Sequence, residues 1–235
     1  VCEIFSYYAD NAKQLLADEE FPITGGTGTI RKTGVGPILG IMPWNYPVYQ
    51  VARFAAPNLV LGNTVLLKHA PICPETALAI EQLMFDAGIP KGAYVNIFAS
   101  HEQAATIISD PRVQGVSLTG SERAGAAVAA EAGKHLKKVV LELGGSDPMV
   151  ILDSDDLPAL VHRAAEARLD NMGQACNSPK RMIVLQDIYP DFVTELVKDF
   201  AGYVPGDPMV EATTLAPLST KVAAQRVHAQ VARAQ

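Results

Sequence analysis

The 235-residue sequence has only three cysteines, Cys2, Cys73 and Cys176, and few aromatic residues, 6% of the total. Three widely spaced cysteines do not make a disulfide framework, and no Cys-x-x-Cys or His-x-x-x-His pattern indicates a metal site. We therefore expect a protein of the reducing cytoplasm. Few aromatic residues, together with 49% hydrophobic residues, are typical of an α/β protein rather than a β-sandwich.

The chain also lacks any stretch close to the roughly 18 to 20 uninterrupted apolar residues of a membrane span. Its first residues lack the basic and then apolar pattern of a signal peptide. The formal net charge is −6 and there is no basic run, so the sequence has no electrostatic footprint for nucleic acid. We expect neither a membrane nor a nucleic acid as a partner.

Short apolar runs alternate with helical patterns over the first part of the chain. Helical spacing predicts a helix at residues 3–19, and Gly/Thr-rich residues 24–34 suit a hairpin or an extended excursion. Strands are expected at residues 37–42, 63–68, 94–99, 115–118 and 139–143, and helices at residues 47–61, 74–87, 101–109 and 121–135. This alternation indicates a mostly parallel, doubly wound sheet, in which a ligand lies beyond the carboxyl ends of the strands.

The character of the sequence changes after Gly145. Further strands are expected at residues 149–152 and 181–185, and further helices at residues 157–172, 189–201 and 219–234. We place a domain boundary near residues 142–146, with a first domain over residues 1–142 that carries a hairpin excursion near 24–36. Residues 143–235 form an incomplete second domain. The chain opens without Met and both ends read as helix, so we expect a fragment of a longer polypeptide.

Two polar candidates follow the first two strands of the predicted sheet. Residues 43–47 (Pro-Trp-Asn-Tyr-Pro) should lie at a carboxyl edge, where the amide of Asn45 could donate to a developing oxyanion. Lys68 ends the next strand, where it could contact ribose hydroxyls or a phosphate. Taken alone, a turn between two prolines and a solvated lysine are the commoner explanations.

Further candidates lie later in the chain. At Gly120 and Ser121 a strand meets a helix, and the N–H groups of a helix start favour a phosphate. Glu142 ends an apolar strand, where a carboxylate suits a general base. Cys176 follows a long helix in a polar Gly-Gln-Ala-Cys-Asn segment, as a nucleophilic cysteine requires. Taken singly, an ordinary turn, an exposed carboxylate and an inert buried cysteine remain the commoner alternatives.

As a set, these segments are far more specific than any one of them. Residues 42–47 (MPWNYP), 118–121 (LTGS), 142–145 (ELGG) and 173–176 (GQAC) resemble, in order and in spacing, the signatures of aldehyde dehydrogenases. The resemblance covers essentially the whole chain. It implies a Rossmann-like cofactor-binding domain, followed by the first part of an α/β catalytic domain.

The resemblance also implies a role for each candidate. The thiolate of Cys176 attacks the aldehyde, and the amide of Asn45 and the backbone N–H of Cys176 stabilise the oxyanion of the thiohemiacetal. Hydride transfer to NAD(P)+ leaves a thioester, which water activated by Glu142 hydrolyses. The expected cofactor-binding residues are Met42, Pro43, Trp44, Lys68, Gly120, Ser121, Leu143 and Gly144.

A finer resemblance points to the bacterial succinate-semialdehyde dehydrogenase branch. It rests on residues 68–71 (KHAP), 141–148 (LELGGSDP) and 180–181 (KR). Many aldehyde dehydrogenases carry a glutamate where this chain has Pro71, and that glutamate binds the adenosine ribose hydroxyls. Its absence removes a carboxylate that would repel a ribose phosphate. We therefore expect NADP to be accepted, with NAD as the alternative, and succinate semialdehyde to be the substrate.

The sequence also departs from the family. The family's polypeptide is much longer, and its later Glu-x-Phe-Gly-Pro segment is absent here, as are the strand that joins a neighbouring subunit and part of the first domain. We expect a homodimer or homotetramer at full length. Basic residues that could face the carboxylate of a semialdehyde are Arg168, Lys180 and Arg181.

Two other functions stay open. One is a truncated, catalytically silent protein that keeps a nucleotide-binding fold for binding or assembly. The other is an acylating dehydrogenase that passes the thioester to coenzyme A. Glu142 argues against the second, because a water-activating carboxylate fits hydrolysis.

Overall fold

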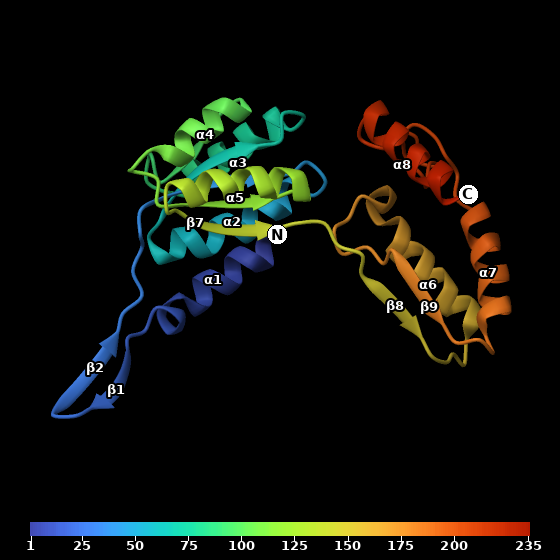
Figure 1. The fold of residues 1–235 in the computed structure, drawn as a ribbon, viewed down its shortest axis with the longest axis horizontal. Helices are drawn as coiled ribbons and strands as arrows, with labels where there is room; N and C mark the ends of the chain where they lie inside the picture. The colour runs from blue at the N-terminus through green and yellow to red at the C-terminus, as the bar shows by residue number, and fades with distance from the viewer. The chain divides into compact units, whose positions relative to one another are not determined.

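The computed structural model describes all 235 residues. The chain divides into two compact units, Val1–Leu143 and Gly144–Gln235, each with its own hydrophobic core. In Figure 1 the colours of the first unit run from blue to yellow-green and those of the second from yellow to red. None of the helices combines the length and the apolar character that a membrane span requires.

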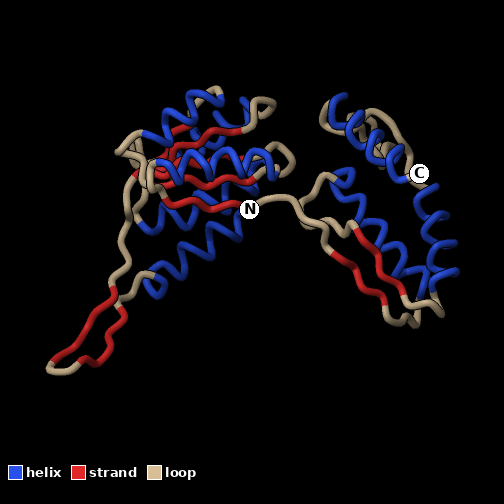
Figure 2. The backbone as a smooth tube through the Cα atoms, in the orientation of Figure 1, coloured by secondary structure: helices blue, strands red, loops and turns tan.

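The first unit is built on a five-stranded parallel sheet, drawn in red in Figure 2. In chain order its strands are β3 (Pro37–Met42), β4 (Thr64–His69), β5 (Tyr94–Asn96), β6 (Gly115–Thr119) and β7 (Lys138–Glu142). Their spatial order is β5-β4-β3-β6-β7. The chain therefore starts in the middle of the sheet, runs outward through β4 and β5, and returns across β3 to fill the other side. The doubly wound parallel sheet predicted from the sequence is confirmed.

Helices cover both faces of this sheet. They are α2 (Pro47–Leu61), α3 (Pro74–Asp86), α4 (His101–Ser109) and α5 (Glu122–Lys134). Alternate residues of β3 point to opposite faces: Met42 packs with the residues of α2 and α3, and Leu39 with those of α4 and α5. The central strands β3 and β4 are largely buried on both faces and are nearly continuous apolar runs, whereas the edge strand β7 is mostly exposed.

The helix ends follow local signals in the sequence. Pro47 opens α2, and Gly62, with a φ of 90°, closes it in the left-handed conformation. Ser100 caps α4 in a capping box, in which its hydroxyl accepts from the amide of Gln103 at 3.2 Å. These helices therefore lie within one residue of their predicted bounds.

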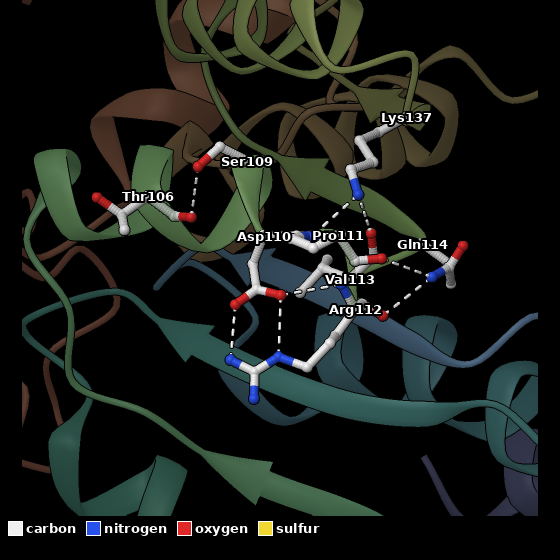
Figure 3. Close-up of polar contacts among 8 residues, drawn as sticks. All are labelled: Thr106, Ser109, Asp110, Pro111, Arg112, Val113, Gln114 and Lys137. Carbon is white, nitrogen blue, oxygen red and sulfur yellow. Dashed lines mark hydrogen bonds and ion pairs between the residues drawn. The ribbon is translucent and has the colours of Figure 1, made fainter.

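A group of polar contacts closes the loop between α4 and β6 (Figure 3). The guanidinium of Arg112 donates to both oxygens of Asp110, at 3.0 and 2.6 Å, and this pairing holds the pKa of that carboxyl far below its usual range. The ammonium of Lys137, just before β7, donates to the carbonyls of Asp110 and Val113 at 2.9 and 2.5 Å. The contacts join β6 and β7 at their amino ends, opposite the edge where the candidate residues lie.

The second unit pairs β8 (Pro148–Ile151) with β9 (Arg181–Val184) in parallel. Its helices are α6 (Leu157–Leu169), the 3₁₀ helix η1 (Asp170–Gly173), α7 (Tyr189–Ala201) and α8 (Lys221–Ala234). The core joins Ile151 of β8, Val161 of α6 and Phe192 of α7, which are all buried. Helix α6 and the loop after it connect the two parallel strands, so the segment around Cys176 leads directly into β9.

Two elements differ from their predicted bounds near the N-terminus. Helix α1 spans Cys2–Leu15, and the hairpin is formed by β1 (Glu19–Ile23) and β2 (Gly26–Ile30). The hairpin begins earlier than the predicted excursion because Gly25, with a φ of 82°, forms its turn instead of lying within a strand.

The helix predicted over residues 157–172 was too long. It ends at Leu169, and Asn171, Met172 and Gly173 follow with φ values of 47°, 60° and 74°. Asn and Gly adopt left-handed φ readily, whereas Met does so at a steric cost. Periodicity of apolar residues cannot reveal such a turn, so the predicted helix continued through it.

Candidate active site

The loops that carry the first candidates lie at the switch point of the sheet. The connection from β3 leads to β4 on one side, and β6, on the other side of β3, leads on to β7. In doubly wound sheets ligands bind beyond the carboxyl ends of strands at such a point. Residues 43–46 after β3 and residues 120–121 after β6 thus lie next to the place where a ligand is expected to bind.

The turn after β3 connects a buried strand to α2. Met42, the last residue of β3, is buried, whereas Pro43, Trp44 and Asn45 are partly buried. Helix α2 begins at Pro47, so the turn is short and held at both ends. The amide of Asn45 therefore belongs to a segment with little freedom to move.

Lys68 lies near the end of β4 and is only 7% exposed, so the alternative of an ordinary solvated lysine is wrong. Burial lowers its pKa. The next residue, His69, is also buried and accepts the amide hydrogen of Ala70 on Nδ1 at 2.7 Å. Its Nε2 is left to donate to the carbonyl of Pro47, at 3.1 Å, which ties the end of β4 to the start of α2.

The turn after β6 leads into α5. Ser121 is the N-cap residue of α5, and its hydroxyl accepts from the amide of Ala124 at 3.3 Å. The amide of Gly120 is bonded to the carbonyl of Glu142 at 2.9 Å, so it belongs to the sheet and is not available to a ligand. The remaining first-turn amides of α5 have no acceptor within the helix and suit an anion.

Leu143 and Gly144 follow β7. A Cβ atom added to Gly125 of α5 would lie 2.7 Å from Cδ2 of Leu143, so the leucine side chain packs closely on that helix. Gly144 is exposed and is the first residue of the second unit. Leu143 therefore has a packing role that its position in the motif did not reveal.

Glu142 ends β7 with its side chain 52% exposed, and its Oε2 lies 3.4 Å from Nη2 of Arg53. Both line a cavity of about 360 Å³ that Met42 and Gln50 also line. Gln50 is buried and accepts from the guanidinium of Arg53 at 3.4 Å, and that guanidinium lies 5.8 Å from the ring of Tyr49. A carboxylate and a cation therefore share one cavity, which runs along the sheet from the amino ends of β6 and β7 to their carboxyl ends.

The sequence did not identify Arg53 as a candidate site residue. A signal was present, because Gln50 and Arg53 are the polar residues of the otherwise apolar stretch 47–56 and lie three apart, on one side of a helix. Nothing in the sequence, however, indicated that this side of α2 faces Glu142.

Cys176 lies in the second unit, in a turn after η1, and its side chain is partly buried. The backbone amides of Ala216 and Ser219 donate to Sδ of Met172 and Oε1 of Gln174, both at 2.9 Å. These bonds hold the segment that precedes the cysteine. Within this unit Cys176 is therefore not fully buried.

The three basic residues near Cys176 all donate hydrogen bonds to backbone carbonyls or to a side chain of the neighbouring loops. Arg168 donates to the hydroxyl of Ser178 at 3.1 Å, and Arg181 donates to the carbonyl of Ser146 at 2.9 Å. The ammonium of Lys180 donates to three carbonyls of the cysteine turn. Lys180 thus has all three of its N–H donors engaged within the second unit, and Arg168 and Arg181 each have one nitrogen engaged there, whereas Arg53 lines the cavity beside Glu142.

No disulfide joins the three cysteines, and no three His, Cys, Asp or Glu side chains gather in a way that would hold a metal ion. The first unit brings Arg53 and Glu142 together in one cavity and places Asn45 in the turn after β3, and the second unit carries Cys176 on a polar turn.

Comparison with known proteins gives the family. All residues, 1–235, match the aldehyde dehydrogenase family. The NADP(+) succinate-semialdehyde dehydrogenase of Deinococcus radiodurans is 54% identical over 228 residues, which are 97% of this chain and 48% of that protein. That of Mycobacterium avium is 43% identical over 230 residues, 97% of this chain and 49% of that protein.

A solved structure agrees. The succinic semialdehyde dehydrogenase of Streptococcus pyogenes, in complex with NADP+, matches with a TM-score of 0.93 and 46% identity, over 97% of this chain and 50% of that one. The chain spans about half the length of the curated relatives it matches. With its four signature segments in order and a family match along its full length, the chain belongs to the aldehyde dehydrogenase family.

Proposed function

We propose that the whole protein oxidises an aldehyde to its carboxylic acid, with NADP or NAD as the hydride acceptor and Cys176 as the nucleophile. The observation that carries this proposal is the carboxyl edge of the sheet. There the Asn45 turn, the Glu142 carboxylate and the α5 start gather at a switch point, in a chain of this family.

The chain's own residues account for the chemistry. The thiolate of Cys176 forms a C–S bond to the aldehyde carbon, and the Asn45 amide and the Cys176 N–H donate to the oxyanion. The dinucleotide, when bound, accepts the hydride. Glu142 then takes a proton from the water that attacks the thioester, which releases the acid and returns the thiol. Its exposed side chain has access to water.

Succinate semialdehyde is the substrate that the cavity supports best. Its distal carboxylate requires a cation near the reacting groups, and Arg53 is held beside Glu142 by Gln50. Arginine suits a carboxylate because its planar fork presents two parallel N–H donors. The names of the relatives agree with this substrate.

NADP is the cofactor that the β4 end supports best. Lys68 lies there, buried, and Pro71 follows it in an exposed turn that carries no carboxylate. The free amides at the start of α5 suit the pyrophosphate. A ribose 2′-phosphate would therefore meet a lysine and no opposing charge, and NAD would lose only that one contact.

The hairpin supports an oligomer. All of β1 is exposed, and Phe21, Ile23 and Ile30 present apolar side chains to solvent. A two-stranded hairpin is marginally stable alone, and apolar patches of this kind mark protein contacts. We infer a homodimer or homotetramer in the cytoplasm, where all three cysteines remain thiols.

A pre-steady-state experiment tests the function. The complete gene product is mixed with succinate semialdehyde and NADP, and NADPH is followed by absorbance. Cys176→Ala should give no burst and no turnover, whereas Glu142→Gln should give a burst of about one NADPH per subunit followed by slow turnover. Cys73→Ala is the control and should behave as the unaltered protein does.

Other outcomes select the alternatives. Undiminished activity in Cys176→Ala would refute the nucleophile. Complete silence with succinate semialdehyde, butanal and benzaldehyde, using either dinucleotide, would favour a binding or assembly protein. NADPH formation that depends on added coenzyme A would indicate an acylating dehydrogenase.

A further inference from the structure

The ammonium of Lys180 is the common donor to three carbonyls of one turn. It lies 3.2 Å from the oxygen of Ala175, 2.9 Å from that of Cys176 and 3.1 Å from that of Ser178. An ammonium has three N–H donors, so each carbonyl receives one and none remains for a ligand. Lys180 is therefore committed to the turn and does not serve as a substrate-binding group.

The backbone of Lys180 is itself held in place by the strands β8 and β9. The backbone amide of Lys180 donates to the carbonyl of Asp147 at 3.1 Å, just before β8. Arg181, the next residue, begins β9, which pairs with β8 in register. The lysine therefore reaches the turn from the edge of a strand pair and not from a loose loop.

The far side of the turn is anchored independently. Ser178 is 3% exposed, and its hydroxyl donates to the carbonyl of Arg168 at 3.0 Å and accepts from that residue's guanidinium at 3.1 Å. Ala175 is buried as well. Cys176 thus stands between two buried residues whose carbonyls both point to the same ammonium.

We propose that Lys180 is a positioning residue for the nucleophile. By binding the carbonyls before, at and after Cys176, it fixes the peptide planes that set the directions of the thiol and of the backbone N–H that faces the oxyanion. The proposal rests on the proposed function of Cys176. A lysine suits this role because a compact ammonium can meet three converging carbonyls, whereas the donors of a planar guanidinium diverge.

The test compares Lys180→Met with Lys198→Met in the complete gene product. Methionine has nearly the length and apolar stem of lysine without its donors, and Lys198 is an exposed lysine of α7 in the same unit. The first readout is the rate at which iodoacetamide alkylates Cys176, measured by mass spectrometry of its peptide. The second is kcat with succinate semialdehyde, and the third is KM for NADP.

Lys180→Met should alkylate Cys176 at a rate that differs at least fivefold from the unaltered protein. It should lower kcat by roughly tenfold to a hundredfold, as a misplaced reacting group does. KM for NADP should stay within a factor of two, because all the expected cofactor-binding residues except Gly144 lie in the first unit. Lys180→Arg should not restore kcat, although it keeps the charge, and Lys198→Met should match the unaltered protein in all three readouts.

Equal alkylation rates and equal kcat in Lys180→Met and Lys198→Met would overturn the proposal. If Lys180→Met does not fold, as judged by its thermal transition, Lys180→Gln decides, since its shorter side chain and two donors cannot meet all three carbonyls: unchanged alkylation and kcat in that variant overturn the proposal. A changed alkylation rate in a protein that oxidises no aldehyde would leave the positioning role intact and refute only the proposed function. Aldehyde oxidation that Lys180→Met leaves unaffected would refute the positioning role and leave the proposed function intact.

Discussion

The guanidinium of Arg53 lies 3.4 Å from the carboxylate of Glu142, which joins the middle of α2 to the carboxyl end of β7. The two side chains are 34% and 52% exposed, so their ion pair contributes little to folding stability. The ion pair instead fixes the position of the Arg53 guanidinium beside the Glu142 carboxylate. Under the proposed function, this cation beside the candidate general base binds a second carboxylate, that of the semialdehyde substrate.

Removal of this cation should therefore weaken the binding of an anionic substrate specifically. A hydrogen bond to a charged group is worth about 1.5–3 kcal/mol, so Arg53→Met should raise KM for succinate semialdehyde by roughly 10- to 150-fold. Butanal has no distal carboxylate, and its KM should change by less than threefold. Arg53→Lys should fall between the two. An equal loss with both aldehydes would show that Arg53 serves Glu142 and not the substrate.

A carboxylate placed at Pro71 should change the choice of dinucleotide. Pro71 lies in the exposed turn after β4, three residues beyond the buried Lys68. Pro71→Glu should raise KM for NADP at least tenfold through repulsion of the 2′-phosphate, while KM for NAD stays the same or falls. Pro71→Gln has the same shape without the charge and serves as the control. If both variants behave alike, charge is not the discriminating factor.

Gly40 should not tolerate a side chain. It lies in the middle of β3, and a Cβ atom there would collide with the ring of Phe54, the α2 residue that lines the cavity beside Glu142. Gly40→Ala should lower the free energy of unfolding by about 1–3 kcal/mol because the ring must move. Gly133→Ala is a matched control in open space within α5, and it should raise that free energy by about 0.5–1 kcal/mol. Urea unfolding of both variants measures the difference.

The second unit should gain stability on mild acidification. Nδ1 of His162 on α6 lies 2.9 Å from the carboxylate of Asp199 on α7, and that hydrogen bond, with the nearby charge of Glu166, raises the pKa of His162 above 6.5. Because the folded-state pKa is the higher one, the stabilisation is full below about pH 6.5 and is lost as pH rises through the folded-state value. His162→Gln should therefore lower the thermal midpoint more at pH 6 than at pH 8.5.

Calorimetry in matched buffers checks this expectation. His228→Gln is the control, because His228 lies on α8 with no ion pair to a carboxylate, and it should change the midpoint little at either pH. An equal effect of His162→Gln at both pH values would mean that the link between α6 and α7 does not depend on protonation.

Much of the fold could be predicted from the sequence, because it follows from local patterns. Alternating apolar runs and helical spacing, with Pro47 and Gly62 at helix ends, led to the five parallel strands and their helices. The four signature segments led to the family, since their order along the chain needs no structure to read. The left-handed turn at Asn171 and Met172 was missed, because apolar periodicity carries no information on backbone handedness.

The roles of the charged residues could not be predicted from local sequence patterns. Lys180 looked like a substrate-binding cation together with Arg168 and Arg181, and folding gave all three of its N–H donors to the carbonyls of the cysteine turn. Arg53 looked like an ordinary helix residue and was brought to Glu142, and Lys68 was buried where solvation seemed the commoner outcome. The physical reason is that a charge takes its role from the partners and the solvent around it. Those partners come from elements far apart in the chain, whereas caps and periodicities involve near neighbours.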